Sequence, residues 1–169
     1  MSIQVVPLAQ CAIPDTDMDH YITGIYALNL PNEKGDVADW HDVFHWRLGI
    51  DNPREISVAG INMKSSNHLY GEYGVKEGRE QLVKKGLIVD KPLVYVANYC
   101  RAVIDMIYDC LAEYDAIYNL TGAVYDWLYE EGQEAEFFEK LEPMKSFFKD
   151  KKRDVLIMWI DKERSLLCQ

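Results

Sequence analysis

The chain of 169 residues lacks the short motifs that identify common enzyme sites. It has no GxxxxGK[ST] loop, no GxGxxG after a strand-like segment and no GxSxG turn, which argues against P-loop, Rossmann and α/β-hydrolase sites. Its four cysteines form no CxxC pair, so we expect neither a zinc ribbon nor a redox dithiol. We interpret all four as reduced thiols, two of them packed in the core.

Long apolar runs are missing as well. No segment approaches the roughly 18–20 apolar residues of a membrane-spanning helix, and the first residues show no basic stretch followed by an apolar one. We therefore expect a cytoplasmic protein without a secretory signal and without a membrane partner. Apolar residues make up 49% of the chain, which is too many for a disordered acidic protein.

Negative charge is what the chain has in excess. The net charge is −10, and residues 109–142 hold ten acids against one base, Lys140, so this stretch alone contributes −9. An acidic face on a folded domain favours a basic protein partner and argues against direct binding to DNA or RNA. The carboxylates predicted to contact that partner are Glu130, Glu131, Glu134 and Glu136.

The first half of the chain, residues 1–90, is predicted to be rich in β-structure and loops, because its apolar and aromatic residues alternate with turn residues. The elements expected there are a strand over 21–30, a short helix over 37–46, a weaker strand over 57–63 and a short helix over 76–85.

The second half, residues 91–169, favours a bundle of about four helices. We expect the first to start at Pro92 and to run to about Glu113. It carries Arg101 and Asp105 at ion-pair spacing, and the sequence leaves open whether that pair is structural or functional. The remaining helices are expected over 117–128, over 137–148 with an interruption at Pro143, and around 155–160. Together the halves predict a single α+β domain, residues 1–169, in which helix dominates.

His41 and His45 are four residues apart and flank Asp42, which is similar to the HExxH pattern of zinc hydrolases. Two imidazoles would bind the metal and the carboxylate would activate its water. This supports one alternative function, a metal-dependent hydrolase centred on His41, Asp42 and His45, with His68 or a carboxylate as the third ligand. Because Asp is shorter than Glu and no spacing fixes the third ligand, we expect no cofactor, and zinc only under this alternative.

Aromatic residues and histidines also gather in loop-like sequence, which is typical of recognition surfaces. The other interpretation is that they pack in the core, and the sequence does not decide between the two. The residues of this predicted surface are Trp40, His41, His45, Trp46, Tyr70 and Tyr73.

The succession GIYALNLP, DWH, YGEYG, VANYCRA and EFFEKL, spread over roughly residues 19–162, resembles a family of small uncharacterised bacterial proteins without an assigned activity. The resemblance implies a bacterial, cytosolic, antitoxin-like or defence-associated protein. With the charge pattern, it favours a non-enzymatic interaction protein of antitoxin, immunity or inhibitor type. A nucleic-acid-mimicking inhibitor and a self-associating homo-oligomer are further alternatives.

Overall fold

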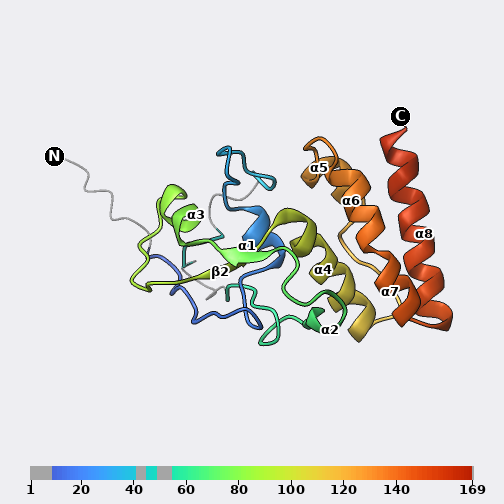
Figure 1. The fold of residues 1–169 in the computed structure, drawn as a ribbon, viewed down its shortest axis with the longest axis horizontal. Helices are drawn as coiled ribbons and strands as arrows, with labels where there is room; N and C mark the ends of the chain where they lie inside the picture. Colours follow the sequence, from blue (N-terminus) through green and yellow to red (C-terminus); the bar gives the residue numbers. More distant parts are fainter. Residues whose placement is uncertain (1–8, 41–44, 49–54, 169) are drawn as a thin grey trace.

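The computed structural model describes residues 9–40, 45–48 and 55–168, which are mostly helical and include a small antiparallel sheet (Figure 1). At this level the predicted α+β class, dominated by helix, is confirmed. The elements are α1 (Gly24–Leu28), α2 (Asn67–Tyr70), β1 (Val75–Glu77), α3 (Arg79–Lys84), β2 (Tyr95–Ala97), α4 (Tyr99–Glu113), α5 (Ala123–Trp127), α6 (Gln133–Lys140), α7 (Glu142–Phe147) and α8 (Asp150–Leu167).

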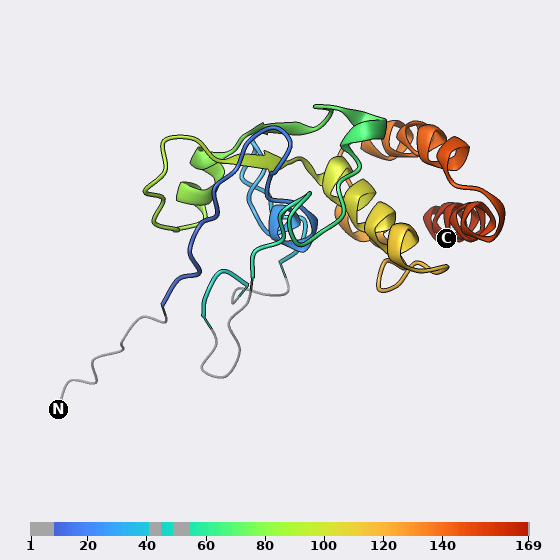
Figure 2. The same cartoon turned by 90° about the horizontal axis from the view of Figure 1, so that it is seen from below.

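Helix α4 is the centre of the molecule. Ten of its 15 residues are buried, and two views show it between the N-terminal segments and the helices α6 to α8 (Figures 1 and 2). Its first turn is capped by Asn98, whose Oδ1 accepts a hydrogen bond from the Arg101 amide at 2.8 Å. The expected start at Pro92 was wrong, because residues 95–97 form β2 and pair with β1.

The strand predicted over 21–30 was also wrong. Residues 24–28 form α1, and only Ile22 makes isolated bridges, to Val58 and Val96. Gly24, Tyr26, Ala27 and Leu28 are all buried, with α1 packed against α4. A helix that is buried on most sides has no polar face, so its sequence resembles that of a buried strand.

Three other short elements of this half differ from prediction. Residues 57–63 form a bridge, a turn and a second bridge in place of a strand. Residues 76–85 divide into the end of β1 and helix α3. Of the helix expected over 37–46, residues 41–44 lie outside the described part, and the described residues 37–40 and 45–46 are not helical.

The C-terminal helices agree better with prediction. Pro143 stands in the first turn of α7, where proline is tolerated, and α7 ends at Phe147. The last helix is confirmed and is longer than expected. By contrast, the helix expected over 117–128 is reduced to the five residues of α5.

Helix α8 holds α5 in place. The buried carboxylate of Glu163 accepts hydrogen bonds from the amides of Gly122 at 2.7 Å and Val124 at 3.1 Å. The Trp159 indole donates to the carbonyl of Leu120 at 3.0 Å. The two hydrogen bonds to Glu163 satisfy amides at the start of α5 that have no partner within the helix.

Arg101 and Asp105 lie in the core, where both side chains are 0% exposed. Arg101 Nε donates to Asp105 Oδ1 at 3.0 Å, and that oxygen also accepts from the Ser66 hydroxyl at 2.6 Å. Asp105 Oδ2 accepts from the hydroxyls of Tyr21 and Thr23 at 2.9 and 2.8 Å. The pair joins α4 to the segments before it, and every group has a partner, which indicates a structural role.

Among the residues described, no helix combines the length and apolar character needed to cross a bilayer.

Candidate functional site

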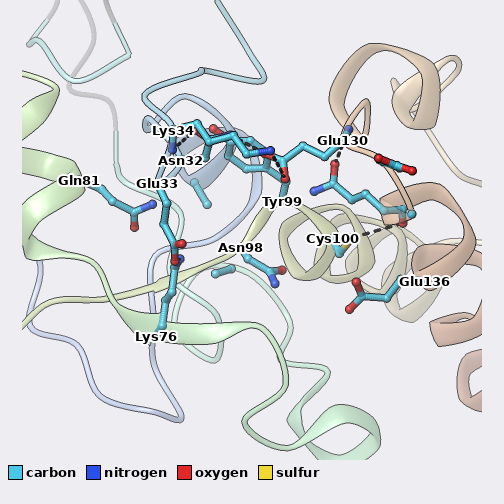
Figure 3. A pocket seen from close by; sticks show the side chains of 15 residues that line it. Asn32, Glu33, Lys34, Lys76, Gln81, Asn98, Tyr99, Cys100, Glu130 and Glu136 are labelled. Carbon is cyan, nitrogen blue, oxygen red and sulfur yellow. Dashed lines mark hydrogen bonds and ion pairs between the residues drawn. The ribbon is translucent and has the colours of Figure 1, made fainter.

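A cavity of about 500 Å³ lies where the N-terminal segments meet the region leading into α6 (Figure 3). We call it the junction pocket. Its volume is within the roughly 300–1,000 Å³ range of ligand sites in proteins. The lining residues are Ala27 in α1, residues 32–34, Lys76 in β1, Gln81 in α3, residues 97–100, residues 130–133 and Glu136.

One wall of the junction pocket is acidic and comes from residues 130–136. Glu130 accepts from the Asn32 amide at 2.6 Å and lies 3.6 Å from Lys34 Nζ. Glu136 accepts from the Tyr73 hydroxyl at 2.7 Å, which is a neutral partner. Glu131 has no ion pair or side-chain hydrogen bond within the part of the chain that the structure describes. This wall therefore carries three carboxylates and one nearby ammonium group.

The opposite wall carries Glu33, Lys76 and Gln81, which lie together in Figure 3. Lys76 Nζ donates to Glu33 Oε1 at 2.9 Å, and this lysine holds the pKa of Glu33 below its usual range. The Gln81 amide nitrogen donates to the carbonyl of Pro31 at 2.9 Å. Its Oε1 is buried and has no hydrogen-bond donor among the described residues. The lysine of this wall is thus already neutralised.

Tyr99 and Cys100 lie between the two walls at the start of α4. The Tyr99 hydroxyl donates to the carbonyls of Leu30 and Asp36, at 2.7 and 2.8 Å. Burial, with the nearby charges of Glu136 and Glu130, raises the pKa of the Cys100 thiol to about 12. A thiol with that pKa is protonated at neutral pH and is a poor nucleophile. The arrangement is suited to binding and not to thiolate chemistry.

The acidic stretch 109–142 is not uniformly free of partners. Four of its carboxylates form ion pairs with lysines outside the stretch; these are Glu113 with Lys64, Asp115 with Lys151, Glu130 with Lys34, and Glu142 with Lys145. Five exposed carboxylates have no ion pair with any described residue, and we call them the α5–α6 acidic surface. They are Asp126, Glu131, Glu134, Glu136 and Glu139.

Exposed tyrosines accompany this surface. Tyr125 lies in α5 and is 67% exposed, and Tyr129, which directly precedes Glu130 and Glu131, is 50% exposed. Tyr114 and Tyr118 are exposed too, and their rings meet edge to face. Tyrosine is enriched where proteins bind one another, because it buries a large area at a low entropy cost. The tyrosines of this region are a signal that the sequence analysis missed.

The predicted aromatic surface is divided by the structure. Trp40 is exposed, whereas Trp46 is 1% exposed and donates its indole N–H to Asn29 Oδ1 at 3.0 Å. Tyr70 is also buried, and Tyr73 is half-buried, with its hydroxyl on Glu136. Trp46 and Tyr70 are therefore core residues, and their assignment to a partner-binding surface is corrected.

The histidines predicted as zinc ligands have different surroundings. His41 lies outside the described residues, as does Asp42. His45 lies 3.4 Å from a carboxylate oxygen of Asp39 and packs against Tyr26. His68 contacts the rings of Tyr108 and Phe147, with centroids 5.4 and 4.9 Å away. Within the described ranges, no group of three or more acidic, histidine or cysteine side chains is placed to hold a metal ion.

Comparison of the chain with family models, curated proteins and solved structures found no match. The resemblance to small bacterial proteins over residues 19–162 therefore stays a prediction.

Proposed function

We propose that this protein binds a basic protein partner through the α5–α6 acidic surface, and that an antitoxin, immunity or inhibitor role is the concrete form of this function. The partner would be met in the cytoplasm. The observation that carries the proposal is the set of five exposed carboxylates that form no ion pair with any described residue, beside two exposed tyrosines. A surface whose only task is solubility does not need aromatic groups among its charges.

In this proposal the carboxylates attract the basic partner, and the tyrosines provide contact area once it is bound. Uncompensated carboxylates attract a basic surface over a distance of about 8 Å at physiological salt and raise the association rate. Tyr125 and Tyr129 supply contact area that does not depend on salt. The proposal therefore implies association that weakens as salt rises without being lost entirely.

The test uses a matched pair of double variants. Glu131→Lys with Glu134→Lys changes the acidic surface, and Glu55→Lys with Asp90→Lys changes two exposed acids of the N-terminal half. Each reversal adds two charges, so both double variants change the net charge from −10 to −6.

The measurement is affinity capture from the host lysate at about 0.05 M and about 1 M salt. We expect wild type and the Glu55/Asp90 variant to retain the same basic protein at low salt, and the Glu131/Glu134 variant to lose it. Equal retention of the partner by both double variants would show that the position of the charges does not affect binding, which would contradict the proposal. If the captured protein also binds nucleic acid and the two ligands compete, the nucleic-acid-mimicking form of the proposal is favoured.

A further inference from the structure

We propose that the junction pocket binds the guanidinium group of an arginine from the basic partner. The inference rests on the proposed function and assigns a specific chemistry to the pocket beside the acidic surface. Glu131 and Glu136 belong to both, so the pocket opens next to the charges that would attract the partner.

The charges of the pocket favour a cation. Four carboxylates and two lysines line it, so its formal charge is four negative minus two positive, or −2. Lys76 is held by Glu33 at 2.9 Å, and Lys34 lies 3.6 Å from Glu130. An anionic ligand would have to displace one of these pairs and approach Glu131 and Glu136, whereas a cation meets two carboxylates that form no ion pair with a described base.

The acceptors favour guanidinium over ammonium. Only one oxygen of Glu136 is engaged, by the Tyr73 hydroxyl, and Glu131 has no side-chain partner in the described part of the chain. Free oxygens on two separate carboxylates suit a planar group with five N–H donors better than a compact ammonium with three. Apolar atoms of Ala27, Ala97 and Cys100 would lie along the arginine stem.

The test compares two peptides of equal length and charge, one whose basic residues are all arginine and one whose basic residues are all lysine. Their affinities are measured by calorimetry with wild type and with Glu131→Gln, Glu136→Gln and Glu139→Gln. Glu139 is the matched control, because it is exposed, belongs to the acidic surface and does not line the pocket.

We expect wild type to prefer the arginine peptide by about tenfold, the factor that one hydrogen bond to a charged group supplies. E136Q and E131Q should reduce this preference severalfold. E139Q should lower the affinity for both peptides equally and leave the arginine preference unchanged. The amide signals of Cys100 and Gln133 should shift in NMR spectra only with the arginine peptide.

Each other result is decisive. Equal binding of both peptides, reduced alike by all three substitutions, overturns the arginine pocket and leaves the proposed function standing. An arginine preference that survives both E131Q and E136Q places the arginine elsewhere and also overturns the pocket. Failure of both peptides to bind overturns the pocket and the proposed function together.

Discussion

Asp105 joins segments that are far apart in the chain. Its two carboxylate oxygens accept from Tyr21, Thr23, Ser66 and Arg101, which come from three regions of the chain. The Arg101 guanidinium in turn donates to the carbonyls of Gly71 and Tyr73 and to Asn67. A buried ion pair of this kind adds little net stability, but breaking it leaves a charge without a partner.

Asp105→Asn should therefore lower the free energy of unfolding by about 3–5 kcal/mol, because it leaves the buried Arg101 guanidinium uncompensated. Urea denaturation followed by circular dichroism measures this. Asp154→Asn, at an exposed position of α8, should change the free energy by less than about 0.5 kcal/mol. Equal losses in the two variants would contradict the structural role of the pair.

The Cys100 thiol predicts how stability depends on alkaline pH. Its pKa is raised from 9.0 to about 12, chiefly by burial and then by Glu136. Below pH 9 the thiol is protonated in both the folded and the unfolded chain, so it does not change the free energy of unfolding there. Between pH 9 and 12 only the unfolded chain releases the proton, so stability falls as pH rises.

We expect the urea concentration at the unfolding midpoint of wild type to decrease as the pH is raised from 8.5 to 10.5, a range that spans the ordinary thiol pKa of 9.0. The decrease should be less steep in Cys100→Ala. Cys168→Ala, at an exposed position, should keep the wild-type slope. The buried tyrosines contribute to both curves, so the difference in slope isolates the thiol. Identical slopes in wild type and Cys100→Ala would show that Cys100 ionises as readily in the folded protein.

At the scale of elements, the helices differ in how far the sequence predicts them. Helix α8 was predicted because charged residues flank its apolar segment, and its packing against α5 and α7 does not change that pattern. Helix α1 was predicted as a strand, because its burial removes the polar face that reveals a helix. The start of α4 was missed because residues 95–97 pair with β1, and pairing between distant segments leaves no local signal.

Helix α5 has five residues and packs against α8. Glu163→Ala should destabilise the protein by about 1–3 kcal/mol, because it leaves the buried amide of Val124 and the part-buried amide of Gly122 without their acceptor. Hydrogen exchange should increase most at residues 122–127. Asp161→Ala, two residues away and exposed, is the control and should leave that exchange unchanged. Faster exchange spread evenly over the molecule would argue against a local anchoring role.

At the scale of the whole molecule, most of the net charge comes from one stretch of the chain, residues 109–142. Four of its ten acids form ion pairs with lysines, and five of the six that have no ion pair with a described residue lie around α5 and α6. The total of −9 for the stretch was readable from the sequence. Which acids lack partners was not, because Lys34 and Lys64 reach the stretch from distant parts of the chain.

This distribution predicts how salt affects stability. Glu131→Gln with Glu134→Gln should raise the melting temperature at about 0.01 M salt, because it relieves repulsion among exposed carboxylates, and the gain should shrink at about 0.15 M. Glu55→Gln with Asp90→Asn removes the same charge from the N-terminal half and should give a smaller gain. Differential scanning calorimetry measures both. A gain that is equal in the two double variants would mean that the acidic surface has no excess repulsion.

The junction pocket shows the limit of sequence reasoning for this protein. Glu130, Glu131 and Glu136 were predicted as contact residues from charge alone, and all three line the pocket. Their neighbours across the cavity, such as Lys76 and Gln81, come from segments about 50 residues away in the sequence, and no spacing rule links them.

The short sheet has a geometric consequence that its size conceals. Strand β2 runs into α4 with only Asn98 between them, so the pleat of three residues sets the rotation of the helix about its axis. Adding or removing one residue at this joint would turn every later side chain of α4 by about 100°. Arg101 would leave its partners in the core, and Cys100 would leave the cavity, in the same movement. Although two strands are too few to be stable alone, here they fix the angular phase of the central helix.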